Sequence, residues 1–270
     1  MTDVILVSAE WLTLRETADA RSRSRRLAHA AARILREPVV VHDLGSGTGS
    51  MMRWLAPYLP GPQTWVLHDW NPDLLEHAAA ESAFDAHGEP VDVDVSVEHV
   101  EHLRASDIEG ATLVTASALL DVLTRDEVES IVQACVDAGA PALLSLSVIG
   151  RVRFEPADPG DHVFQEAFND HQRRTAEDRT LLGPDAVTVV AESFRRAGWV
   201  VRVAGTAWRL GSSDAALAAE WLEGWVAAAV EQRPALLEWG QEYLQTRTRQ
   251  LLSGDLRVVV HHADLLARPR

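Results

Sequence analysis

The residues best suited to chemistry lie in the segment Asp43-Leu44-Gly45-Ser46-Gly47-Thr48-Gly49, where an acidic residue precedes a glycine-rich turn. Glycine allows the backbone to take positive φ angles and to approach a ligand closely. The N–H groups at the start of a following helix attract an anionic or polar ligand. The apolar run Val39-Val40-Val41 predicts a buried strand before the turn. The pattern therefore predicts a nucleotide-like ligand over this turn, and a structural turn without a cofactor is the alternative interpretation.

A second acidic residue, Asp69, ends the apolar run Val66-Leu67-His68. A carboxylate at the end of a second strand can accept hydrogen bonds from both hydroxyls of a ribose. Asp69 lies 24 residues after Gly45 (69 minus 45), close to the roughly 20 residues expected for such a pair. The alternative interpretation is an Asp that only caps the next helix.

The spacing of the glycines indicates which kind of nucleotide-like ligand the turn would bind. A dinucleotide-binding turn needs G-x-G-x-x-G, but Ser50 stands where the last glycine would be. The arrangement D-x-G-x-G-x-G instead resembles motif I of the class I S-adenosylmethionine-dependent methyltransferases. Asp69 followed by the pair Leu74-Leu75 resembles the next motif of that family. The resemblance covers residues 38–149.

This resemblance implies an enzyme that transfers a methyl group from S-adenosylmethionine to a small-molecule acceptor, with S-adenosylhomocysteine (SAH) as product. The adenine is expected near the end of the third strand, where Asp94 and Glu98 are alternatives to Ser96. An arginine of an N-terminal helical cap would suit the carboxylate of the cofactor. The residues expected to bind the cofactor are Asp43, Gly45, Ser46, Gly47, Gly49, Asp69, Trp70, Asn71, Ser96, Val97, Ser117 and Arg15.

No motif identifies a general base. His162 and His171 lie in a polar segment that would cover the site, and we name them as candidate catalytic residues; Asp161 and Asp170 are alternatives. A histidine on the surface or in the core is the competing interpretation for each.

The fold class expected from the alternation of elements is α/β, a Rossmann-like, mostly parallel seven-stranded sheet flanked by helices. The single domain is divided into an N-terminal helical cap (1–37), a cofactor-binding core (38–149), a lid segment (150–184) and a helical insertion (205–255) before the last strand. Expected helices cover 16–36, 51–59, 125–138, 163–174, 185–198, 213–230 and 234–252, with another after Pro72. Expected strands are 39–41, 64–68, 91–97, 111–116, 142–148, 199–204 and 256–261.

Composition excludes several classes of function. The net charge is −15, whereas nucleic-acid binding usually needs a basic surface. All 25 basic residues are arginine, which disfavours Schiff-base and P-loop chemistry. Cys135 is the single cysteine, so an intrachain disulfide cannot form. No apolar stretch is long enough to span a membrane and no leader is apparent, so we expect a cytoplasmic protein without metal, membrane or nucleic-acid partners.

Two other functions remain open at this stage. One is a non-catalytic Rossmann-like protein that binds the cofactor or serves as a partner subunit, and the other is a different user of the same cofactor, such as an aminopropyl transferase. An NAD-dependent oxidoreductase is opposed by the glycine spacing. Trp208, Trp221, Trp225 and Trp239 crowd the last third of the chain. They fit core packing best, with an aromatic pocket or a homodimer interface as alternatives.

Overall fold

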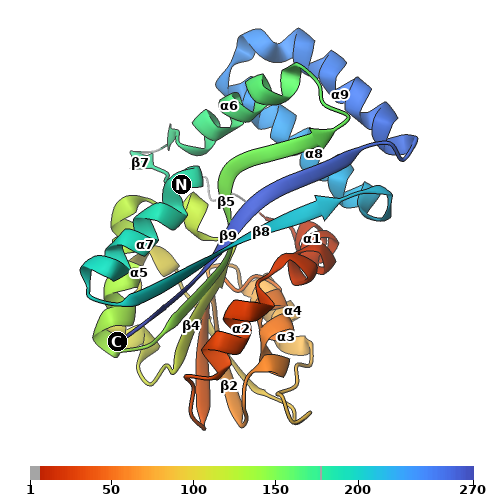
Figure 1. The fold of residues 1–270 in the computed structure, drawn as a ribbon. Helices are drawn as coiled ribbons and strands as arrows, with labels where there is room; N and C mark the ends of the chain where they lie inside the picture. Colours follow the sequence, from red (N-terminus) through yellow and green to blue (C-terminus); the bar gives the residue numbers. More distant parts are fainter. Residues whose placement is uncertain (1–6, 177) are drawn as a thin grey trace.

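A computed structural model describes residues 7–176 and 178–270, and its centre is a seven-stranded sheet (Figure 1). The strand order is β3-β2-β1-β4-β5-β9-β8, in which the first five are parallel and β9 pairs antiparallel with both neighbours. The strands are β1 (Val39–Leu44), β2 (Gln63–Asp69), β3 (Asp92–Val97), β4 (Leu113–Ser117), β5 (Ala142–Glu155), β8 (Val200–Leu210) and β9 (Arg257–Arg268). This architecture confirms the predicted fold class.

The helices lie on both faces of the sheet. They are α1 (Ala9–Ser22), α2 (Arg25–Ala32), α3 (Ser50–Leu55), α4 (Pro72–Ala80), α5 (Arg125–Ala138), α6 (Gly160–Gln172), α7 (Ala186–Arg196), α8 (Ala215–Gln232) and α9 (Leu237–Leu252). A short hairpin, β6 (Thr175–Ala176) and β7 (Arg179–Thr180), follows α6.

Each face of the sheet has its own hydrophobic core, because successive residues of a central strand point to opposite faces. Leu143 of β5 packs with α2, α3 and α4, whereas Leu144 packs with α5 and α7. This alternation is what a parallel sheet covered on both sides requires. The cores hold the carboxyl ends of β1, β2, β3 and β4 along one edge. The strand order reverses between β1 and β4, and ligands bind at such a switch point.

The strands β5, β8 and β9 are longer than the sequence predicts, and they continue past this edge to carry α6, α8 and α9 (Figure 1). In β5 the prediction ended at residue 148, because the following Arg151, Arg153 and Glu155 are polar. Those three side chains are exposed, while Val152 and Phe154 between them pack toward a third core. The predicted lid therefore begins as strand.

The N-terminal helix predicted over 16–36 is two helices. Arg23 leaves the helical conformation with ψ 144°, and the Ser24 side chain then accepts a hydrogen bond from the N–H of Leu27. This N-cap starts α2 in a new direction. The predicted capping box of α5 is present, because Thr124 and Glu127 bond each other's backbone N–H groups.

Candidate cofactor and acceptor site

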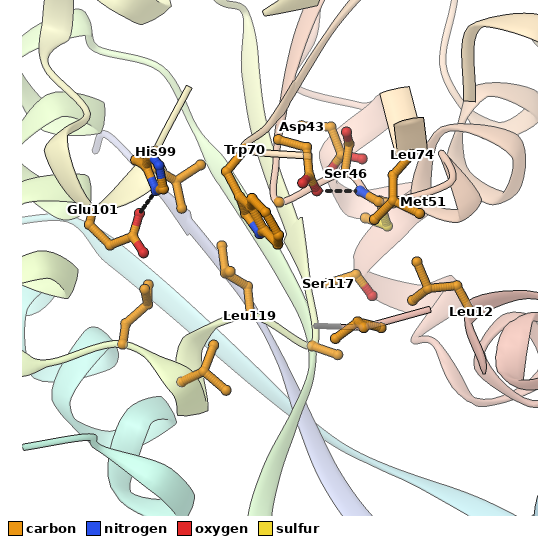
Figure 2. A pocket seen from close by; sticks show the side chains of 18 of the residues that line it. Leu12, Asp43, Ser46, Met51, Trp70, Leu74, His99, Glu101, Ser117 and Leu119 are labelled. Carbon is orange, nitrogen blue, oxygen red and sulfur yellow. Dashed lines mark hydrogen bonds and ion pairs between the residues drawn. The ribbon is translucent and has the colours of Figure 1, made fainter. Parts of the chain in front are cut away.

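A pocket of about 530 Å³ opens at the carboxyl edge of the sheet (Figure 2). It is lined by the glycine turn, by the loops that follow β2, β3 and β4, and by α1. Asp43, Ser46, Trp70 and Leu119 point toward the same space in Figure 2, although they come from three different segments of the chain. The pocket therefore lies where the sequence predicts a nucleotide-like ligand.

The glycine turn needs its glycines for two reasons. Gly45 and Gly47 have φ of 61° and 54°, a region that favours glycine. A Cβ on Gly47 would lie 2.9 Å from Cδ1 of Leu12 in α1, and one on Gly45 would lie 3.0 Å from Cδ1 of Leu119. The turn is thus closely packed by apolar side chains while its backbone remains at the pocket.

Asp69 ends β2 and binds the glycine turn directly. Its Oδ2 accepts the N–H of Gly47 at 2.8 Å, and its Oδ1 accepts the N–H of Asn71 at 2.9 Å. The side chain is buried and lines the pocket, and burial raises its pKa above the usual value. Asp69 therefore both orders the turn and presents a desolvated carboxylate to a ligand.

Asp43 ends β1 and is only 1% exposed. Its Oδ1 accepts a hydrogen bond from the Thr115 hydroxyl at 2.7 Å, but its buried Oδ2 has no partner among residues 7–176 and 178–270. Burial raises the pKa of Asp43 to about 6. Ser46 Oγ, in the same pocket, is also buried and has no partner in those ranges. Since buried polar atoms are normally bonded, both atoms indicate a polar ligand here.

At the end of β3, two residues predicted to bind the cofactor lie outside the pocket lining. Ser96 is not among the lining residues, and its hydroxyl donates to Glu98 Oε1 at 2.9 Å. Val97 is 60% exposed on the edge of the sheet. The chain leaves the sheet after Val97, so Glu98, His99 and Val100 reach the pocket instead. Glu98, which the sequence offered only as an alternative, is the acidic residue at this position.

Two further predicted residues have other roles. Asn71 caps α4 by accepting the N–H of Asp73 at 3.0 Å, and it does not line the pocket. Gly49 is the N-cap of α3, with φ 79°, and likewise lies outside the pocket lining. Both shape the turns that carry Trp70 and Ser46.

Behind Glu98 lies a row of buried histidines that sequence reasoning missed. His68 Nδ1 bonds Glu98 Oε1, and His68 Nε2 lies 2.9 Å from His42 Nδ1. The two rings stack with centroids 5.0 Å apart. Burial, with the neighbouring His68, lowers the pKa of His42 to about 4. The alternation along β1 and β2 places these rings on one face of the sheet, which was the available signal.

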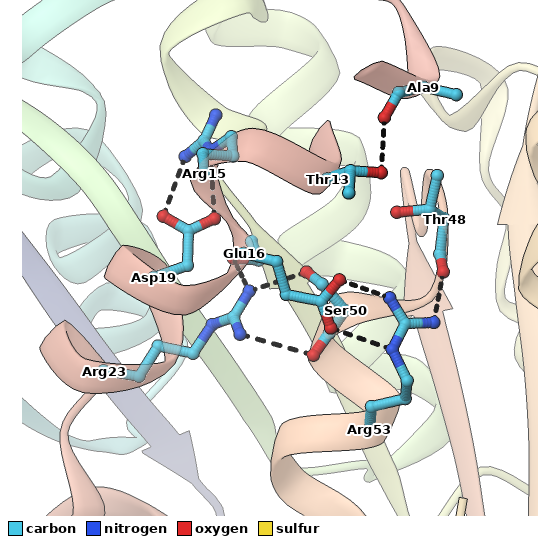
Figure 3. Close-up of polar contacts among 10 residues, drawn as sticks. Ala9, Thr13, Arg15, Glu16, Asp19, Arg23, Thr48, Ser50 and Arg53 are labelled. Carbon is cyan, nitrogen blue, oxygen red and sulfur yellow. Dashed lines mark hydrogen bonds and ion pairs between the residues drawn. The ribbon is translucent and has the colours of Figure 1, made fainter. Parts of the chain in front are cut away.

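Helix α1 is fastened over the pocket by charged side chains (Figure 3). Arg15, a predicted cofactor contact, lines the pocket, and its guanidinium pairs with Asp19 at 2.9 Å. Arg53 of α3 pairs with Glu16 at 2.6 Å. The buried Arg23, just past the end of α1, donates to the hydroxyls of Ser50 and Ser117, each at 3.0 Å. Ser117 thus lines the pocket while it anchors this cap.

The two candidate catalytic histidines lie apart from this pocket. The His162 side chain is 73% exposed and pairs with Glu166 on the surface of α6, so the structure gives it no place in either cavity. His171 is buried and lines a second cavity. An N–H of Arg174 Nη1 donates to its Nδ1 at 3.0 Å, and its Nε2 lies 3.1 Å from Glu231. Both ring nitrogens of His171 therefore already have hydrogen-bond partners.

The second cavity adjoins the first and has a volume of about 280 Å³. Val122, Arg174 and Leu181 line both cavities. The remaining lining of the second cavity comes from Asp121, just after β4, and from α6 and α8. A ligand in the second cavity would therefore lie beside one in the first.

Other predictions concern packing and partners. Trp225 is 1% exposed and packs among Phe154, Phe164 and Phe168, which agrees with core packing for this residue. Within the described ranges, no helix has the length and apolar character to cross a membrane. In the same residues, no cluster of three or more His, Cys, Asp or Glu is placed to hold a metal ion.

The sheet and its helices form a Rossmann-like α/β fold with a pocket at its switch point. Comparison with solved structures finds the following likenesses. The mycolic acid cyclopropane synthase CmaA1, complexed with SAH and CTAB, is 16% identical over 90% of this chain and 81% of its own, with a TM-score of 0.48. The cyclopropane synthase MmaA2 from Mycobacterium tuberculosis is 15% identical over 99% and 87%, with a TM-score of 0.48.

A third structure is the SAM-dependent methyltransferase from Geobacter sulfurreducens in complex with S-adenosyl-L-homocysteine. It is 15% identical over 98% of this chain and 92% of its own, with a TM-score of 0.44. No family model matches the chain, and no curated protein matches it. All three structures have TM-scores below 0.5 and identities of 15–16%, so their own activities are not evidence for the function of this chain.

Proposed function

We propose that this protein is an S-adenosylmethionine-dependent methyltransferase that acts on a small molecule. The observation that carries the proposal is the pair of buried carboxylates, Asp43 and Asp69, on either side of the Gly45–Gly49 turn in one pocket. Asp43 Oδ2 and Ser46 Oγ are without partners among the described residues. A ligand with a cationic group, an anionic group and ribose hydroxyls would satisfy this set.

The residues present fit this cofactor. Asp69 is suited to accept the ribose hydroxyls, and Asp43 Oδ2 is suited to accept an ammonium group. The backbone of the turn and Ser46 Oγ are suited to the carboxylate of the amino-acid part. Trp70 offers an aromatic surface for the adenine, close to Glu98. Arg15, which already pairs with Asp19, stays a candidate contact to the carboxylate.

When bound, the cofactor supplies an electrophilic methyl group on a sulfonium. The chain must then hold the acceptor in line with that methyl group and keep water away. The cap formed by α1, fixed by Arg23 and by the Glu16–Arg53 pair, serves the second purpose. The cavity beside Val122 and Leu181 provides a place for the acceptor.

Two features support a small acceptor. The second cavity is of small-molecule size at about 280 Å³. The net charge of −15 would repel a nucleic acid over a long range.

The decisive test is calorimetric titration of the purified protein with S-adenosylmethionine, SAH and NAD. We expect micromolar binding of the first two, no binding of NAD, and a loss of at least tenfold in Asp69→Ala, because a carboxylate that bonds the ribose is removed. Asp92→Ala is the matched control, since Asp92 is an exposed carboxylate on the adjacent strand β3 and lies outside the pocket lining. A folded wild-type protein that binds neither cofactor form would overturn the proposal.

A further inference from the structure

Two charged groups of opposite sign, Asp121 and Arg174, line the second cavity. Asp121 lies on one wall, in the short helical turn Leu120–Val122 after β4, and Arg174 lies at the end of α6 on the boundary with the first cavity. No salt bridge is found for either side chain within residues 7–176 and 178–270. Unpaired charges in a partly enclosed space are costly unless a ligand compensates them.

Asp121 is oriented to accept hydrogen bonds. The only side-chain donor recorded near its carboxylate in the described residues is Gln172 Nε2, at a long 3.5 Å from Oδ2. Gln172 Oε1 is itself buried and has no partner among the described residues. Burial raises the pKa of Asp121, although its own backbone N–H and the positive charge of Arg15 act in the opposite direction. The two side chains therefore offer acceptor oxygens that an ammonium group would satisfy.

Arg174 is held with one end of its guanidinium occupied. Its Nη1 donates to His171 Nδ1 and to the His171 carbonyl oxygen, both at 3.0 Å. His171 is in turn fixed by Glu231 through Nε2. In the part of the chain that the structure describes, Nη2 and Nε of Arg174 make no hydrogen bond. The row Glu231–His171–Arg174 thus positions a cation whose remaining N–H groups suit a carboxylate.

The rest of the lining is mainly apolar. Phe168, Leu181, Ala228 and Val122 line the same cavity. A wholly apolar ligand would leave both Asp121 and Arg174 desolvated and unpaired. A ligand with a single charge would pair with one of these two groups and leave the other one unpaired. Only a ligand with both charges and an apolar body complements the whole surface.

We propose that the second cavity binds a zwitterionic, amino-acid-like acceptor, with its ammonium group on Asp121 and Gln172 and its carboxylate on Arg174. That this ligand is the methyl acceptor rests on the proposed function, whereas the binding itself does not. Val122, Arg174 and Leu181 line both cavities, so the acceptor lies directly beside the cofactor pocket.

The test uses three probes with the same phenyl group: L-phenylalanine, 2-phenylethylamine and 3-phenylpropionate. Each is titrated calorimetrically into the full-length protein, with and without saturating SAH. We expect the zwitterion to bind at least roughly tenfold more tightly than either singly charged analogue, because each charged hydrogen bond contributes about that factor.

Two variants assign the charges. Asp121→Asn should weaken the zwitterion and the amine but not the acid, and Arg174→Gln should weaken the zwitterion and the acid but not the amine. Asp126→Asn and Arg195→Gln are matched controls, because both residues are exposed and lie outside the cavity.

Equal binding of the three probes, or variants that change all three alike, would refute the zwitterion site. Tighter binding of the amine alone would also refute it and would assign a cationic ligand instead. If the wild-type protein prefers the zwitterion but does not bind SAH, the zwitterion site is supported and the proposed methyltransferase function is refuted.

Discussion

The backbone N–H of Gly47 donates to Oδ2 of Asp69 at 2.8 Å, although the two residues are 22 positions apart in the chain. This bond joins the turn after β1 to the end of β2. The two sequence motifs are therefore one physical unit, because the carboxylate that is proposed to bind the ribose also fixes the turn that is proposed to bind the amino-acid part. Changes to either residue should affect both.

The first prediction concerns Gly47→Ala. The new Cβ would have φ near 54° and would lie 2.9 Å from Leu12, so we expect a loss of about 1–2 kcal/mol in the free energy of unfolding and weaker cofactor binding. Denaturant unfolding and calorimetry measure these two effects. Gly88→Ala is the control, since Gly88 has φ 84° but no atom within 4 Å of a new Cβ. It should lose stability without losing affinity, and the same loss of affinity in both variants would contradict the prediction.

The second prediction is that Asp43→Asn stabilises the protein at pH 7.5. Burial raises the pKa of Asp43 from 3.8 to about 6, so the folded state binds a proton more tightly than the unfolded state. This contribution favours folding below pH 3.8 and is lost as the pH rises through about 6. An amide removes the charge, and we expect a gain of up to about 3 kcal/mol by urea unfolding at pH 7.5. The gain should shrink at pH 5, and a variant that is less stable at both pH values would contradict this account.

The third prediction is that SAH affinity falls below about pH 6. Asp43 must be ionised to bind an ammonium group, and its pKa in the empty pocket is about 6. Each further unit of acidification should weaken binding roughly tenfold, since one proton must leave Asp43 before binding. Calorimetry from pH 5 to 8 measures the slope. Asp43→Asn should bind weakly at every pH without this slope, and an identical slope in the variant would assign the titration to another group.

The fourth prediction concerns acid stability through His262, which is buried in β9 beside Trp208. Burial lowers the pKa of His262 from 6.5 to about 3, so the folded state keeps the ring neutral. Stability from this residue is present above pH 6.5 and is lost as the pH falls toward 3, because the unfolded chain takes up the proton. The loss between pH 6.5 and 5 should be about 2 kcal/mol. His262→Gln should reduce this loss of stability, measured by urea unfolding at the two pH values. His87→Gln should not reduce it, because His87 is exposed.

The parts of the site that could be predicted from the sequence are those built from neighbouring residues. Asp43, the glycine turn and Asp69 lie within strand–turn–helix units, so their spacing alone indicates how they are arranged. The residues that were missed meet across long separations. Trp208 bonds Asp19 from 189 positions away, and Asp264 accepts the N–H of Ser24 from 240 positions away. No local pattern contains such contacts.

The same reason explains why other residues of the site could not be placed from the sequence. Ser96 and Glu98 are two residues apart, so alternation places both on one face, and only the point where the chain leaves β3 decides which reaches the pocket. His171 has the residue type of a base, but Arg174 and Glu231 occupy its nitrogens. The sequence does not single out Asp121, because the wall opposite it comes from the distant helices α6 and α8.

The position of β9 between β5 and β8 has a consequence for the order of assembly. Residues 200–210 of β8 hydrogen-bond to residues 257–268 of β9. They do not pair with β5, the strand of this sheet that comes before β8 in the chain. Until β9 is in place, one edge of β5 and all of β8 present unpaired backbone groups, which invite pairing with other chains. Such distant pairings also slow the search for the native state. We therefore expect refolding yield to depend on protein concentration, with intermolecular association competing against insertion of the last strand.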